Sequence, residues 1–155
     1  MFSSKGYLRA LQAIEEKHGG ILRPRDVVDE ARDENNVLHN YFEWDDAKAA
    51  DEHRLWQARQ LITYEFQTVE SKEPEQVYFS LPSQREKPDG GYFRIDIIED
   101  DPLKLEELKK EAARELRRVN EKYRKIAELG AVRKVSESFI QRYFPSFQVS
   151  ANSGM

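Results

Sequence analysis

Residues 38–62, LHNYFEWDDAKAADEHRLWQARQLI, form the stretch on which the expected fold of this chain depends. The stretch begins with apolar side chains that follow no regular period: Leu38, Tyr41, Phe42 and Trp44. We expect this cluster to be buried, because an exposed apolar group of this size is unusual on a monomer. Helical spacing then runs over residues 46–62, where Asp45 and Asp46 are suited to cap the first turn.

Two shorter helices are predicted on the N-terminal side of this stretch. Apolar residues recur at helical spacing within residues 4–18, and Gly19 and Gly20 are suited to end that helix. Pro24 favours the first turn of a second helix over residues 24–32.

On the C-terminal side the period changes to the alternation that is typical of strands. Residues 64–68 and 76–81 are predicted as two strands joined by a polar turn. Residues 82–91 have the composition of a loop, and a third strand is predicted over residues 92–98.

Two helices are predicted in the last third of the chain, over residues 102–129 and 132–143, with Gly130 between them. The longer one carries a continuous apolar stripe: Leu105, Leu108, Ala112, Leu116, Val119, Tyr123 and Ile126. This stripe is longer than a small sheet can cover, so we expect a homo-oligomer, most simply a two-fold dimer.

Together these elements predict an α+β fold. Residues 1–81 are expected to form a trihelical, winged-helix-like module with a β hairpin, and residues 82–155 to add a third strand and a C-terminal helical arm. Winged helix-turn-helix proteins have this order of elements, and their third helix enters the DNA major groove. A trihelical core with a hairpin can equally be a stable small fold without that use.

Composition excludes several kinds of protein. The 155 residues contain no Cys, so disulfides, thiolate metal sites and cysteine nucleophiles are excluded. No apolar run approaches the roughly 20 residues of a membrane span, and residues 1–10 lack the apolar core of a signal peptide. We therefore expect a cytoplasmic protein, in the cytoplasm of the host cell if the protein is viral.

The net charge of −4 is unevenly distributed. Residues 1–63 carry a net charge of −3, residues 64–101 a net charge of −6 and residues 102–155 a net charge of +5. Only the last third therefore has a surplus that attracts a polyanion.

Two groups of basic residues are candidates for nucleic-acid binding. On the third helix the candidates are Lys48, Arg54 and Arg59, with Gln57 and Gln60 beside them, although the acidic start of that helix opposes phosphate. On the long C-terminal helix the candidates are Arg114, Arg117, Arg118, Lys122 and Lys125. A charge run of this kind is also typical of a solvated helix face.

No residues form a catalytic motif, and we expect neither an enzyme nor a cofactor. His53 lies near acidic residues in sequence, but Asp45 and Asp46 are explained as helix-start residues, so no metal site is predicted. Serine residues lack a histidine partner by motif, which leaves nucleophilic catalysis without support.

Several phrases resemble, in combination, a family of small proteins of unassigned function encoded by tailed phages and prophages. The phrases are LHNYFEWDDAKAADEHRLWQARQLI at 38–62, YFSLPS at 78–83, GGY at 90–92 and ELRRVNEKYRKIAEL at 115–129. The resemblance covers about residues 7–130 and implies a viral context. We therefore expect a non-enzymatic accessory protein that binds DNA during regulation, replication or packaging. The alternative is a phage structural or adaptor protein that acts through protein–protein contacts.

Overall fold

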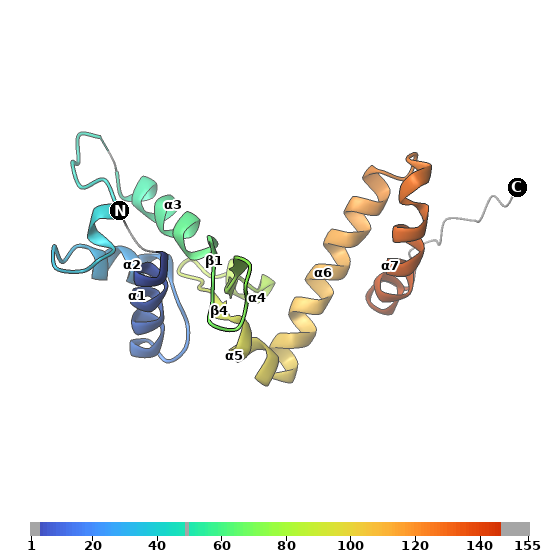
Figure 1. Cartoon of the computed structure of the whole chain (residues 1–155), viewed down its shortest axis with the longest axis horizontal. Coiled ribbons are helices and arrows are strands. Elements are labelled where there is room, and N and C mark those ends of the chain that lie inside the picture. The colour runs from blue at the N-terminus through green and yellow to red at the C-terminus, as the bar shows by residue number, and fades with distance from the viewer. Residues whose placement is uncertain (1–3, 49, 147–155) are drawn as a thin grey trace, which may run out of the picture. The chain divides into compact units, whose positions relative to one another are not determined.

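A computed structural model describes residues 4–48 and 50–146 (Figure 1). The chain divides into two compact units, Met1–Pro102 and Leu103–Met155, so the division falls at residue 102 and not at residue 81.

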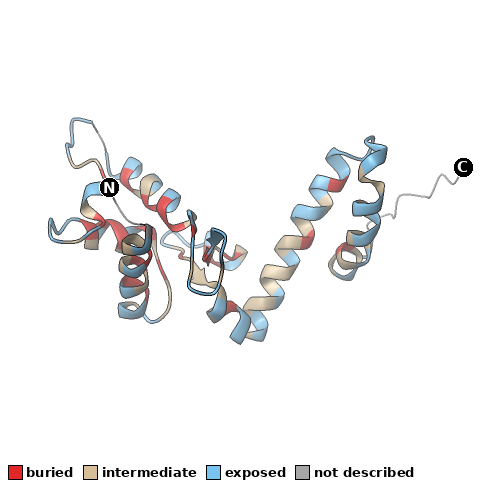
Figure 2. Cartoon of the chain, in the orientation of Figure 1, coloured by how far each residue is buried: buried red, intermediate tan, exposed pale blue. Residues whose placement is uncertain are grey.

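The first unit is built on three helices, α1 (Ser4–Lys17), α2 (Pro24–Ala31) and α3 (Asp51–Ile62). The first two confirm the predicted helices at these positions. Gly19 and Gly20 follow α1 with φ angles of 75° and 91°, a conformation that glycine adopts without steric cost. The fully buried core residues include Leu11, Leu22, Val27, Leu38, Ile62, Phe66 and Tyr78, and Figure 2 shows buried positions gathered on α1, α2 and α3.

The third helix starts five residues later than predicted. Asp46 lies in a turn, and Ala50 stands at the N-cap position of α3. The expected capping role of Asp46 is therefore wrong, because its carboxylate instead pairs with Arg54. The apolar stretch before α3 contains the 3-10 helix η1 (His39–Tyr41), and Trp44 is half-buried against the edge of the core.

The predicted strands are reduced to short pairs. β1 (Glu65–Phe66) pairs with β2 (Glu75–Gln76), and β3 (Tyr78–Phe79) pairs with β4 (Phe93–Arg94), both antiparallel. The chain changes from one partner to the other at Val77, so no continuous hairpin wing forms. The α+β, winged-helix-like fold expected from the sequence is therefore wrong: the described chain is helix-rich, with two small two-stranded sheets.

Two short helices replace structure that was predicted as loop and strand. α4 (Pro82–Arg85) lies in the expected loop, and α5 (Ile95–Asp100) takes up most of the expected third strand. The turn after α4 is tight, since a Cβ on Gly90 would lie 1.7 Å from the carbonyl oxygen of Gln84. A β-bridge between Leu22 and Tyr92 then ties the chain back to the link between α1 and α2.

The second unit is an α-helical hairpin of α6 (Pro102–Lys122) and α7 (Gly130–Tyr143), joined through the 3-10 helix η2 (Ala127–Leu129). The long predicted helix thus ends at Lys122, and Gly130 begins α7 where it was expected only to stop the preceding helix. Within the described part of this unit the buried residues are Ala113, Asn120 and Ile140. None of the helices in residues 4–48 and 50–146 has the length and apolar content needed to cross a bilayer.

Candidate functional site

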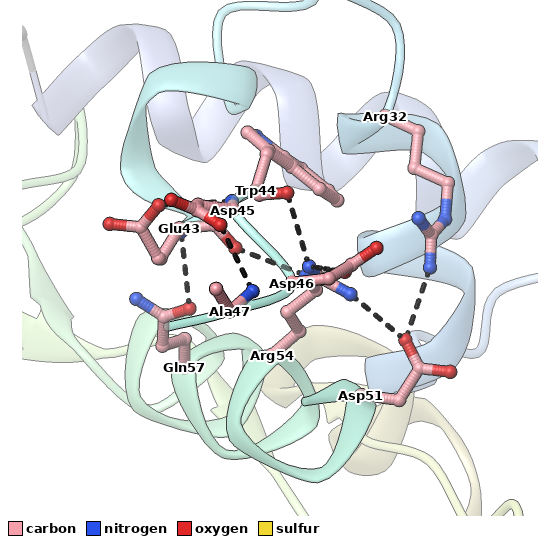
Figure 3. Close-up of polar contacts among 9 residues, drawn as sticks. All are labelled: Arg32, Glu43, Trp44, Asp45, Asp46, Ala47, Asp51, Arg54 and Gln57. Atoms are coloured by element: carbon pink, nitrogen blue, oxygen red, sulfur yellow. Dashed lines mark hydrogen bonds and ion pairs between the residues drawn. The ribbon is translucent and has the colours of Figure 1, made fainter. Parts of the chain in front are cut away.

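The side chain of Arg54 organises the loop that precedes α3 (Figure 3). Only 3% of Arg54 is exposed. Its Nε donates to the carbonyl oxygen of Glu43 at 3.0 Å, and its Nη1 donates to Asp51 Oδ1 at 3.2 Å. Its Nη2 donates to the carbonyl oxygen of Trp44 at 3.4 Å and forms an ion pair with Asp46. All three guanidinium nitrogens therefore donate to acceptors of the same chain.

Trp44 is the second fixed point of this loop. Its Nε1 donates to the carbonyl oxygen of His39 at 2.8 Å, and its ring stacks on the His39 ring with 5.1 Å between centroids. The guanidinium carbons of Arg32 and Arg54 lie 5.4 Å and 5.3 Å from the centre of the indole ring. Arg32 Nη2 also donates to Asp51 Oδ1 at 3.3 Å, so α2 and α3 meet at this cluster.

These contacts give Trp44, Asp45 and Asp46 a structural role in the loop before α3. The hydrogen bond from Arg54 lowers the pKa of Asp46, which keeps that carboxylate ionised opposite the guanidinium. Asp45 makes a turn-forming contact instead, accepting the backbone N–H of Ala47 at 2.9 Å.

The other predicted residues of the third helix lie on the surface. Lys48 is exposed in the turn before α3, and Arg59 is exposed on the helix itself. Beside Arg59 the exposed face of α3 carries Trp56, which is 53% exposed and stacks on His53 with 5.6 Å between ring centroids. Sequence analysis missed this exposed tryptophan, because helical periodicity alone gave no reason to place a large aromatic residue in solvent.

In the second unit α6 and α7 are held together by polar as well as apolar contacts. Asn120 Nδ2 donates to Ser136 Oγ at 2.8 Å, and the Tyr143 hydroxyl donates to Glu106 Oε2 at 3.0 Å. Arg133 Nη1 donates to the carbonyl oxygens of Tyr123 and Ile126, which lie in the turn after α6. The hydrogen bond from Tyr143 lowers the pKa of Glu106.

Two of the five basic candidates in this unit form ion pairs within their own hairpin. Arg114 forms an ion pair with Glu111, and Arg117 Nε donates to Glu121 Oε1 at 3.3 Å. Both guanidiniums also lie over the ring of Phe144, at 5.8 Å and 5.2 Å. The other three candidates, Arg118, Lys122 and Lys125, are exposed, and Lys125 lies in the turn after α6.

Helix geometry separates the charged and apolar side chains of the hairpin. At 3.6 residues per turn, the apolar row of α6 lies about a quarter of a turn to one side of the α7-facing residues Ala113 and Asn120. Arg114 and Lys110 lie about as far to the other side. On α7 a row of Val132, Val135 and Phe139 is displaced in the same way from Ile140. Because α6 and α7 run antiparallel, the two rows fall on one side of the hairpin.

We call this side the apolar face, and its residues are Leu105, Leu108, Ala112, Leu116, Val119, Val132, Val135 and Phe139. Its most solvent-accessible members are Val135 at 81% and Val132 at 64% exposure, and Val119 is 50% exposed. The opposite side is the basic face, with Lys110, Arg114, Arg117, Arg118 and Lys134. The position of Phe144 beneath Arg114 and Arg117 agrees with this assignment.

Within each unit the predicted site residues have different surroundings. Arg54 is internal, Lys48 and Arg59 are on the surface of the first unit, and Arg114, Arg117 and Arg118 share the basic face of the second. Lys122 lies on the edge of α6 that is turned away from α7. The apolar row on α7 was not predicted from the sequence, although its spacing of three and four residues is typical of one helix face.

Comparisons with protein-family models, with curated proteins and with solved structures found no match.

Proposed function

We propose that this protein is a non-enzymatic DNA-binding accessory protein of a phage or prophage, and that it contacts DNA through the basic face of its C-terminal hairpin. One observation carries the proposal: five basic residues of the hairpin, those of the basic face, lie on the side opposite its apolar face. Residues 103–155 carry 12 basic and 7 acidic side chains, whereas residues 1–102 carry 13 and 22. The hairpin is thus the part of the chain that attracts phosphate.

The binding that this face supports is to the phosphate backbone. Arginine and lysine on one side of a helix neutralise phosphates and release condensed counterions, which gives affinity without reading the base sequence. The pair of Arg117 with Glu121 does not oppose this, because both side chains are exposed, such pairs are weak and phosphate can replace the carboxylate. Arg54 is not part of this proposal, because its guanidinium is buried and bonded within the protein.

The proposed setting is the cytoplasm of the host cell, where the chain acts as a homo-oligomer during regulation, replication or packaging. The viral context is supported by the phrases at residues 38–62, 78–83, 90–92 and 115–129, which resemble those of phage proteins. The oligomer is supported by the apolar face, half of whose residues are exposed.

A second candidate function is that of an adaptor that binds another protein. It is favoured by the exposed face of α3, where Trp56 is 53% exposed, and by Tyr64 just beyond the helix, which is 57% exposed. Tryptophan and tyrosine are the residues that most often anchor protein interfaces.

A fluorescence anisotropy titration with duplex DNA at two salt concentrations tests the proposal. We expect binding at low salt that weakens steeply at the higher salt, with similar affinity for unrelated duplex sequences. Absence of binding at low salt would reject the proposal and favour the adaptor.

A further inference from the structure

Four of the eight residues of the apolar face are exposed: Leu116, Val119, Val132 and Val135. Among the described residues of Leu103–Met155, only Ala113, Asn120 and Ile140 are buried, and one of these three is polar. Two helices that bury so little do not make an independent core, because stability comes mainly from apolar surface removed from water. Something must therefore lie against the apolar face.

We propose that a second copy of this chain covers the apolar face, so that two hairpins form a four-helix bundle. This inference rests on the homo-oligomer of the proposed function and is independent of DNA binding. A two-helix hairpin with one apolar side is half of such a bundle, and the bundle is completed by the same surface from a symmetry mate.

The spacing of both apolar rows is suited to this packing. The row on α6 advances by three or four residues at each step, from Leu105 to Val119, and the row on α7 does the same from Val132 to Phe139. This is the repeat with which helices pack side by side at small crossing angles. The row on α6 spans fifteen of the 21 residues of that helix, which is most of its length.

If the two copies are related by a two-fold axis parallel to the helices, the charges beside the apolar rows of one copy face opposite charges of the other. That axis places α6 of one copy over α7 of the other. Glu115 flanks the row on the outer edge of α6, and Arg142 flanks the row on the outer edge of α7; both are exposed.

The axial positions of these two residues also match. The hydrogen bond between Asn120 and Ser136 fixes the register of the hairpin. Glu115 precedes Asn120 by five residues, about 7.5 Å along α6, and Arg142 follows Ser136 by six, about 9 Å along α7 in the same direction. Glu115 of one copy and Arg142 of the other therefore come to one level in the dimer.

This arrangement leaves both basic faces outside the bundle, on opposite sides. Arg118, which lies on the basic face, is then distant from the interface, whereas Val135 is inside it. The two positions form a matched pair for a test in which each receives a Glu.

Light scattering during size-exclusion chromatography, without DNA, tests the inference on the whole chain. The parent is expected at twice its 18.2 kDa mass at high micromolar concentration. Val135→Glu should give the monomer mass, and Arg118→Glu should stay dimeric. A monomeric parent, or a dimeric Val135→Glu variant, would overturn the inference.

Exchanging the charges at positions 115 and 142 tests the two-fold arrangement of the two copies. Glu115→Arg and Arg142→Glu should each raise the dimer dissociation constant about five- to tenfold, and the double variant should return it to near the parent value. Failure of the double variant to recover would overturn the proposed arrangement of the two copies. A dimer that binds no DNA would reject only the DNA-binding function, and a monomer that binds DNA would reject only the dimer.

Discussion

The guanidinium of Arg54 binds both the ring and the backbone of Trp44: it lies 5.3 Å from the centre of the indole and donates to the carbonyl oxygen at 3.4 Å. One side chain of α3 thereby fixes the irregular segment that leads into the helix. An arginine that looks like a DNA-contacting residue in sequence is thus an internal support.

Removal of this support is expected to loosen the segment before α3. Arg54→Met deletes the donors to the backbone of Glu43 and Trp44 and to the carboxylates of Asp46 and Asp51, so the segment loses the contacts that attach it to α3. We expect a lower melting temperature and faster trypsin cleavage after the exposed Lys48, followed by mass spectrometry of the fragments.

Arg59→Met is the matched control, since it removes an exposed arginine from the same helix. It should leave both the melting temperature and the cleavage rate near those of the parent. Equal cleavage of the Arg54 and Arg59 variants would contradict the structural role of Arg54.

Glu15 is expected to make stability depend on pH. It is 1% exposed, and burial raises the pKa of its carboxyl even though Arg94 lies 3.7 Å away. A carboxyl with a raised folded pKa stabilises the fold below its ordinary pKa, and this contribution is lost as pH rises through the folded pKa.

The free energy of unfolding of Glu15→Gln, relative to the parent, should therefore rise above about pH 4.5, by at most about 1.4 kcal/mol per pH unit. Urea unfolding between pH 4 and pH 8 measures this difference. Glu16→Gln, at the exposed neighbouring position, should show no such trend, and a flat difference for Glu15→Gln would refute the assignment.

Gly90 is expected to tolerate no side chain. A Cβ there would lie 1.7 Å from the backbone oxygen of Gln84, so Gly90→Ala should lower the free energy of unfolding by roughly 1–3 kcal/mol. At Gly6 in α1 the nearest atom is 3.8 Å from the added Cβ, and Gly6→Ala should be neutral or slightly stabilising. Chemical denaturation measures the free energy of unfolding of both variants. Equal values for Gly90→Ala and Gly6→Ala would contradict the tight turn.

The parts of the fold that sequence predicts well are those with local signals at their ends. Gly19, Gly20 and Pro24 mark the boundaries of α1 and α2 without help from distant residues. The start of α3 could not be read, because Asp46 has the chemistry of a cap but is bound by Arg54, eight residues away. Local pattern does not distinguish these two uses of an aspartate.

The remaining errors have similar causes. The turn that follows α6 accepts hydrogen bonds from Arg133 at carbonyl oxygens ten and seven residues earlier, contacts that no local pattern reveals. In residues 92–98, Ile95 and Ile98 fit a helical turn as well as Ile95 and Ile97 fit a strand, so a short apolar run was ambiguous. The basic candidates of α6 could be named from sequence, but their shared face required the contacts with α7.

The dependence of DNA affinity on salt tests the central claim, that the basic face of the hairpin binds phosphate. The measurement compares the parent with a variant in which Gln replaces Arg114, Arg117 and Arg118 of the basic face and Lys122 on the neighbouring edge of α6. A control variant loses the same charge from the first unit, at the exposed residues Lys5, Arg9, Lys72 and Lys87. We predict that the hairpin variant binds more weakly and that its slope of log affinity against log salt is flatter by up to about 3.6, while the control keeps the parent slope. Equal slopes for the hairpin variant and the parent would contradict the claim.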